Sequence, residues 1–188
     1  MSRTTILPGI MLALAALGGC AGKAPLLPAS ATQGPEAYLL GVGDTVRITV
    51  FNEASLTGEY KVTDAGNISF PLIGNVPTAG LRLTELQAAL AARLDEGYVN
   101  NPNVSVEVAQ YGPYYILGEV SKPGEYPFRY GLIMEQAVAA AGGFSYRANR
   151  GQVFLRRRGD KLEYRVDLDK NPIAVQPGDT IRVGERFF

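Results

Sequence analysis

Short segments in which apolar and polar residues alternate, separated by turns, run through most of this chain and constrain its fold more than any other feature. The clearest is residues 104–108 (VSVEV), and residues 45–51 repeat the pattern. A period of two predicts strands with one buried face. Further strands are expected at residues 68–73, 115–120, 126–128, 153–157 and 162–166. Turns are expected at Gly74-Asn75 and at residues 122–125.

Two short helices interrupt these strands. Thr84 is a candidate N-cap for a helix that ends near Glu96, before Gly97. Its apolar face holds Leu86, Ala89, Leu90 and Leu94. A second helical face holds Met134, Ala137, Val138 and Ala141, before Gly142-Gly143. The pattern predicts an α+β chain that is rich in β-structure and has two short helices.

The first thirty-five residues are expected to lie outside the fold. Residues 6–17 are a run of 12 mostly apolar residues, too short to span about 30 Å of hydrocarbon. The run is typical of a signal peptide, here residues 1–19. It is followed by Leu17-Gly18-Gly19-Cys20, which resembles the lipobox of bacterial lipoproteins and implies a lipidated Cys20. An ordinary cleavage site beside a chance cysteine is the alternative. Residues 20–35 are expected to be the lipidated N-terminus and a proline-rich linker.

The residue inventory excludes several kinds of site. The chain has no histidine and one cysteine, so it cannot build a Ser-His-Asp or Cys-His triad or a histidine-bearing zinc site. No phosphate-binding glycine loop is present, and a net charge of zero gives no reason to expect nucleic acid. We therefore expect no enzyme activity and no cofactor. A carboxylate-only glycan hydrolase is the distant alternative, because that chemistry needs no histidine.

Charge is divided between consecutive segments. Residues 36–128 carry a net charge of −6, and residues 129–165 carry +5. Arg156, Arg157 and Arg158 lie within the basic segment and are candidates for an assembly or glycan contact. A solvated hairpin would explain the same residues.

A Gly-Asp pair occurs twice before a strand pattern, as Gly43-Asp44 and Gly178-Asp179. We interpret each aspartate as a turn residue that bonds nearby backbone amides. A functional role for Asp44 or Asp179 is the alternative.

Several motifs, taken in order, resemble one protein family. They are YLLGVGD at 38–44, TDAGNISFPLIG at 63–74, LGEVSKPGEY at 117–126, AAAGGF at 139–144 and PGDTI at 177–181. The chain is similar to Wza-type outer-membrane polysaccharide export lipoproteins, and in particular to short members of that family. The resemblance implies a polysaccharide export N-terminal domain at 36–110, a soluble-ligand-binding β-grasp domain at 111–170 and a closing C-terminal strand segment at 171–188.

The same resemblance implies a function and partners. It implies a homo-oligomeric ring on the periplasmic face of the outer membrane, held by the lipid anchor, that conducts capsular polysaccharide or exopolysaccharide. An inner-membrane chain-length regulator (co-polymerase) would deliver the polymer. The sequence shows no segment that could span the outer membrane, so an outer-membrane β-barrel partner is expected. A non-conducting periplasmic glycan-binding or adaptor module is the alternative.

Replacing the cysteine tests the predicted anchor. Cys20→Ser is expected to block lipidation and to release the exported protein from membranes, because the thiol is the only group the lipid could modify there. Membrane fractionation and the intact mass of both proteins measure this. A wild-type mass that corresponds to an unmodified thiol would contradict the prediction.

Overall fold

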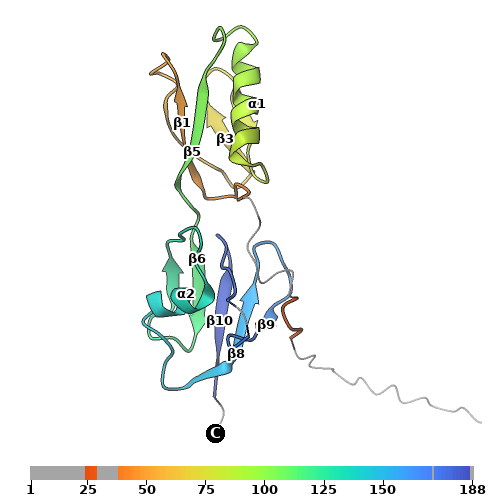
Figure 1. Cartoon of the computed structure of the whole chain (residues 1–188), viewed down its shortest axis with the longest axis vertical. Helices are drawn as coiled ribbons and strands as arrows, with labels where there is room; N and C mark the ends of the chain where they lie inside the picture. Colours follow the sequence, from red (N-terminus) through yellow and green to blue (C-terminus); the bar gives the residue numbers. More distant parts are fainter. Residues whose placement is uncertain (1–23, 29–37, 171, 187–188) are drawn as a thin grey trace, which may run out of the picture.

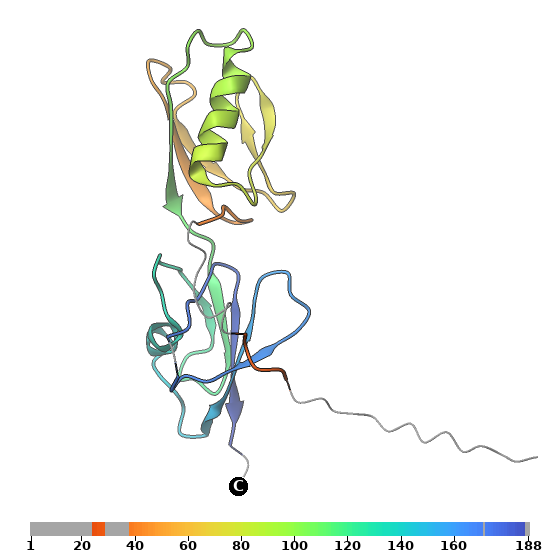
Figure 2. The ribbon, with the colours of Figure 1, turned by 45° about the vertical axis from the view of Figure 1, so that its right-hand side comes forward.

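The fold consists of two α+β units stacked along the long axis of the molecule (Figure 1). The structure is a computed structural model that describes residues 24–28, 38–170 and 172–186. Each unit has its own hydrophobic core. A short connection after strand β5 joins them (Figure 2).

The first unit combines a three-stranded antiparallel sheet, a separate hairpin and one helix. Its elements are β1 (Thr45–Val50), β2 (Gly58–Lys61), β3 (Asn67–Phe70), β4 (Gly74–Pro77), α1 (Leu83–Asp95) and β5 (Val104–Gln110). The sheet order is β2-β1-β5, and β3 pairs with β4. Alternate residues of β1 are buried, as the period-two pattern predicts.

Helix α1 covers this core with one apolar face. Leu86, Leu90 and Leu94 are fully buried at a spacing of four residues, which confirms the predicted face. The predicted N-cap is wrong, because the helix begins at Leu83 and Thr84 lies inside its first turn. The N-terminus is capped by Glu85 instead, whose Oε2 accepts a hydrogen bond from the Arg82 amide at 2.8 Å.

The second unit is a five-stranded sheet with one helix. Its elements are β6 (Tyr114–Gly118), β7 (Gly124–Tyr126), α2 (Met134–Ala140), β8 (Ala148–Arg156), β9 (Tyr164–Val166) and β10 (Thr180–Glu185). The order is β7-β6-β10-β8-β9, so the last strand in the chain lies in the middle, parallel to β6 and antiparallel to β8. Met134, Ala137 and Val138 of α2 are buried in the core of this unit.

Two predicted turns are placed differently in the structure. The expected strand at 68–73 ends at Phe70, because Pro71 has no amide hydrogen to continue the ladder and Leu72 takes a φ of 68°. Gly74 and Asn75, predicted as a turn, are the first residues of β4. Similarly, Gly124 pairs with Ile116 as the first residue of β7, so that strand begins earlier than predicted.

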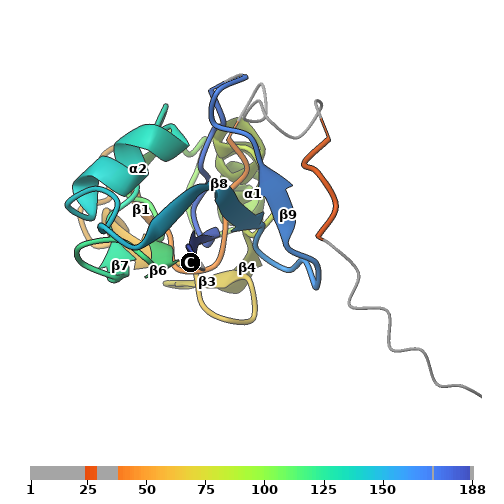
Figure 3. The same cartoon turned by 90° about the horizontal axis from the view of Figure 1, so that it is seen from below.

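Residues 24–28, which were expected to be part of a linker, lie beside the edge strand β9 (Figure 3). The Leu27 amide donates to the Arg165 carbonyl at 2.9 Å, and the Arg165 amide donates to the Pro25 carbonyl at 2.7 Å. Leu27 also packs against the core of the second unit. The predicted signal peptide and Cys20 fall outside the described residues.

Candidate functional site

The three arginines predicted as an assembly or glycan contact, here called the arginine patch, lie at the end of β8, where the hairpin approaches the junction between the units. Arg156 is exposed on the strand. Arg157 is half-buried, and its Nη1 atom lies 2.6 Å from Oδ2 of Asp179 and donates to the Ala174 carbonyl at 3.0 Å. Arg157 is therefore part of the second unit's internal structure.

Arg158 lies against the backbone of three glycines from different parts of the chain. A Cβ atom at Gly41 or Gly178 would overlap its guanidinium group, and one at Gly112 would lie 3.1 Å from Nη2. Gly41 belongs to the first unit, Gly112 to the connection and Gly178 to the second unit. Arg158 thus lies close to one glycine of each unit and one of the connection.

The two Gly-Asp pairs form turns of the same geometry. In each turn the aspartate amide donates to the carbonyl three residues earlier at 3.1 Å. In return, Oδ2 of Asp44 accepts from the Gly41 amide at 2.8 Å, and Oδ2 of Asp179 accepts from the Gln176 amide at 2.7 Å. Both aspartates are fully buried. The prediction that they bond nearby amides is confirmed.

Asp44 also bonds the connection between the units. Its Oδ1 accepts from the Gly112 amide at 2.7 Å, and its Oδ2 accepts from the Tyr38 hydroxyl at 2.5 Å. From the other side, the Gly178 amide donates to the Pro113 carbonyl at 2.6 Å. The Gly112-Pro113 connection is therefore hydrogen-bonded to a Gly-Asp turn of each unit.

Aromatic rings extend this junction. The Tyr111 ring meets Tyr38 edge to face at 4.9 Å and Phe128 at 5.4 Å between centroids. Burial, and then the hydrogen bond to Asp44, raise the pKa of the Tyr38 hydroxyl, so this group stays protonated and keeps donating. Tyr38 was not predicted to be a site residue, because its hydroxyl meets Asp44 only once the turn from Gly41 to Asp44 has formed.

Asp179 is less completely bonded than Asp44. Its Oδ1 is buried and has no hydrogen-bond partner among the described residues. Burial raises the pKa of this carboxyl to about 6, although Arg157 and the Gln176 amide oppose the shift. Ionising the Asp179 carboxyl therefore costs more free energy in the folded protein than in the unfolded chain.

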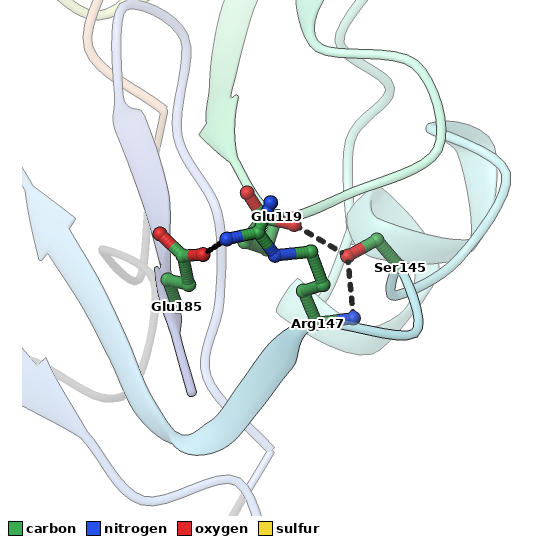
Figure 4. A network of polar contacts seen from close by, with 4 residues as sticks. All are labelled: Glu119, Ser145, Arg147 and Glu185. Carbon is green, nitrogen blue, oxygen red and sulfur yellow. Dashed lines mark hydrogen bonds and ion pairs between the residues drawn. The ribbon is translucent and has the colours of Figure 1, made fainter. Parts of the chain in front are cut away.

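A second polar network closes the opposite end of the second unit (Figure 4). The Ser145 hydroxyl donates to Oε2 of Glu119 at 2.6 Å and accepts from the Arg147 amide at 3.1 Å. Arg147 forms an ion pair with Glu185 at the end of β10. These contacts fasten the loop after α2 to the ends of β6 and β10.

Each of the two units matches a known protein family or domain. Residues 32–109 match the family described as "Polysaccharide biosynthesis/export protein", and residues 113–166 match the SLBB domain. The chain belongs to the polysaccharide biosynthesis/export protein family. The expected resemblance is therefore confirmed.

Two named relatives belong to polysaccharide production and transport. The chain is 34% identical over 154 residues to the exopolysaccharide production protein ExoF of Rhizobium meliloti, covering 73% of this chain and 36% of ExoF. It is 28% identical over 158 residues to the polysialic acid transport protein KpsD of Escherichia coli, covering 79% of this chain and 28% of KpsD. The chain thus spans about a third of the length of these relatives. Their names describe exopolysaccharide production and polysialic acid transport.

The junction is tested by Asp44→Asn. The amide nitrogen of asparagine would replace one carboxylate oxygen, so at least one of the three donors at Tyr38, Gly41 and Gly112 would lose its acceptor. We expect a loss of about 2–4 kcal/mol in the free energy of unfolding and faster hydrogen exchange at the Gly112 amide. Urea unfolding and NMR exchange measure these. The exposed Asp64→Asn is the matched control, and unchanged protection of Gly112 in Asp44→Asn would argue against the junction bond.

The raised pKa of Asp179 predicts a pH dependence. Its ordinary value of 3.8 rises to about 6 on folding, so the folded state holds the proton more tightly than the unfolded chain does. Stability from this group is therefore complete below about pH 4 and is lost as the pH rises through about 6. The unfolding free energy of the wild type minus that of Asp179→Asn should fall by up to about 3 kcal/mol between pH 4 and pH 7. A difference that instead grows with pH would show that Arg157 dominates.

Proposed function

We propose that this protein is an outer-membrane lipoprotein that forms a homo-oligomeric ring on the periplasmic face and conducts capsular polysaccharide or exopolysaccharide outward. The observation that carries the proposal is the direct succession of an export-family unit and an SLBB unit, joined through the Asp44 and Gly178 contacts. A connection bonded from both sides suits a wall element that must hold its shape while polymer passes.

The docking of residues 24–28 supports an orientation for this ring. Only three residues lie between Cys20 and Ala24, so an extended chain could place the Cα atoms of these two residues at most about 14 Å apart. If Cys20 carries the lipid, the edge of β9 lies close to the membrane. We propose that the second unit faces the outer membrane and that the first unit faces the inner-membrane chain-length regulator.

Neither helix within residues 24–28, 38–170 and 172–186 is long and apolar enough to cross a membrane. The proposal also includes an outer-membrane β-barrel partner that completes the export path.

Subunit contacts in the ring are proposed to be head to tail. The acidic first unit and the basic second unit of neighbouring copies complement each other in such a contact, which closes into a ring if the rotation permits. Within the predicted arginine patch, Arg156 carries this proposal, because Arg157 and Arg158 are engaged inside the chain. Reversing all three charges would therefore disturb the fold along with any contact between subunits.

Two experiments test the proposal. Deleting the gene should trap polysaccharide in the periplasm, and the detergent-extracted protein should appear in electron micrographs as closed rings with a central opening. A small, non-ring protein whose loss only weakens secretion would identify a glycan-binding or adaptor module instead.

Arg156→Glu is expected to weaken the ring. The single reversal places a negative charge where an acidic neighbour is proposed, while the Arg157 and Arg158 contacts remain. Exposed ion pairs contribute under about 1 kcal/mol, so the effect should be a shift of the oligomer equilibrium to higher concentration. Mass photometry across a dilution series measures it. The exposed Lys122→Glu is the control, and identical dilution curves for the two variants would remove Arg156 from the subunit contact.

A further inference from the structure

A groove opens in the second unit where the ladder between β8 and β9 stops. The last residues paired across these strands are Val153 and Val166. At the same place the register with β10 shifts, so that Val183 pairs with Val153 but Gly184 pairs with Asn149. Residues 150–152 are left without a partner on β10. Such a bulge re-aims side chains and is common beside binding sites.

The groove has the size of a small-ligand site. Its volume is about 380 Å³. Ligand pockets begin at about 300 Å³, and this volume suits one or two sugar rings. It is bounded by the first turn of α2, the bulged end of β8, strand β9 and the segment that follows β9, and its lining includes Glu135, Phe144, Arg150, Arg165, Leu168 and Asp169.

Phe144 and Leu168 supply the apolar part of the groove. Both pack against the core of the second unit, so their positions are fixed. Gly142 and Gly143 take φ values of 80° and 81°, which end α2 and direct the chain to Phe144, where a β-bridge to Val120 holds the backbone. The Arg150 guanidinium lies 5.4 Å from the Phe144 ring centroid.

Polar side chains of both charges line the groove. Among the described residues, the side chains of Glu135, Arg165 and Asp169 form no ion pair or hydrogen bond with other protein groups, although they line one cavity. Asp167, also in the lining, is paired with Lys170 at 3.3 Å. The groove thus presents free carboxylates and a free guanidinium above an apolar floor.

We infer that this groove is a saccharide subsite that holds one or two uncharged sugar units of the transported polymer. The three lining carboxylates are balanced by Arg150, Arg165 and the adjacent Lys170, so the groove favours neither an anionic nor a cationic ligand. A sugar hydroxyl donates and accepts, and can therefore bond a carboxylate and a guanidinium together. The C–H face of a sugar ring matches the floor formed by Phe144 and Leu168. This inference rests on the proposed role in polysaccharide export.

Calorimetric titration of the full mature protein in detergent tests the inference. The probe is a mixture of oligosaccharides from partial hydrolysis of the host's secreted polysaccharide, separated by anion exchange into neutral and acidic fractions. Arg165→Gln with Asp169→Asn should weaken binding of the neutral fraction at least about tenfold, because two hydrogen bonds to charged groups are lost. Both side chains are exposed, so the fold should be retained. The matched control is Arg129→Gln with Asp160→Asn, which changes two exposed residues outside the groove.

Other results of the same titrations would overturn the saccharide subsite. Equal affinity of the groove double variant and the wild type would overturn the subsite, as would binding of the acidic fraction alone. A wild-type protein that restores secretion but binds neither fraction would overturn the subsite and leave the export function standing. Failure of the export function itself would appear separately, as normal secretion in the gene deletion.

Discussion

The carboxylate of Asp44 is the contact on which the arrangement of the two units depends. It is fully buried and receives hydrogen bonds from the Tyr38 hydroxyl and from the amides of Gly41 and Gly112. Burying a charge is costly unless it is fully hydrogen-bonded, and here both oxygens are engaged. The same group therefore closes the first turn of the fold and fixes the exit from β5. Asp179 repeats the turn in the second unit, but its Oδ1 has no hydrogen-bond partner within the part of the chain that the structure describes, so the two turns differ in how fully the carboxyl group is bonded.

Periodicity in the sequence predicted those strands and helices that have one buried face and one exposed face. Strand β1 and the leucine face of α1 follow their patterns closely, because one face of each packs on the core. Strand β2 was not predicted, because Tyr60 is its only large apolar residue. One such residue between Glu59 and Lys61 is too short a pattern of apolar and polar residues to indicate a strand. The start of α1 was misjudged because Glu85 caps it from within the first turn. Local residue preferences did not indicate that arrangement.

The candidate site was harder to predict because its contacts join distant residues. Arg156, Arg157 and Arg158 form one charge cluster in the sequence, but the fold leaves Arg156 exposed, pairs Arg157 with Asp179 and places Arg158 against three glycines. Those roles depend on the register between β8 and β10 and on the glycine turns. Neither the strand register nor the turn geometry can be predicted from the composition of the sequence. The groove beside β9 likewise arises from a register shift. Lipidation of Cys20 and the predicted domain boundaries stay predictions.

The central place of β10 also governs how this protein acquires its structure. The second sheet joins β6 to β8 only through the chain's last strand, as Thr180 pairs with both Tyr115 and Arg156. Until residues 180–185 have been synthesised and can pair, β6 and β8 have no shared partner, and the edge of each strand that faces β10 stays open. The first unit has no such dependence, because its sheet is complete once β5 has emerged. Folding should therefore proceed from the first unit to the second, with the second sheet assembled in one late, long-range step.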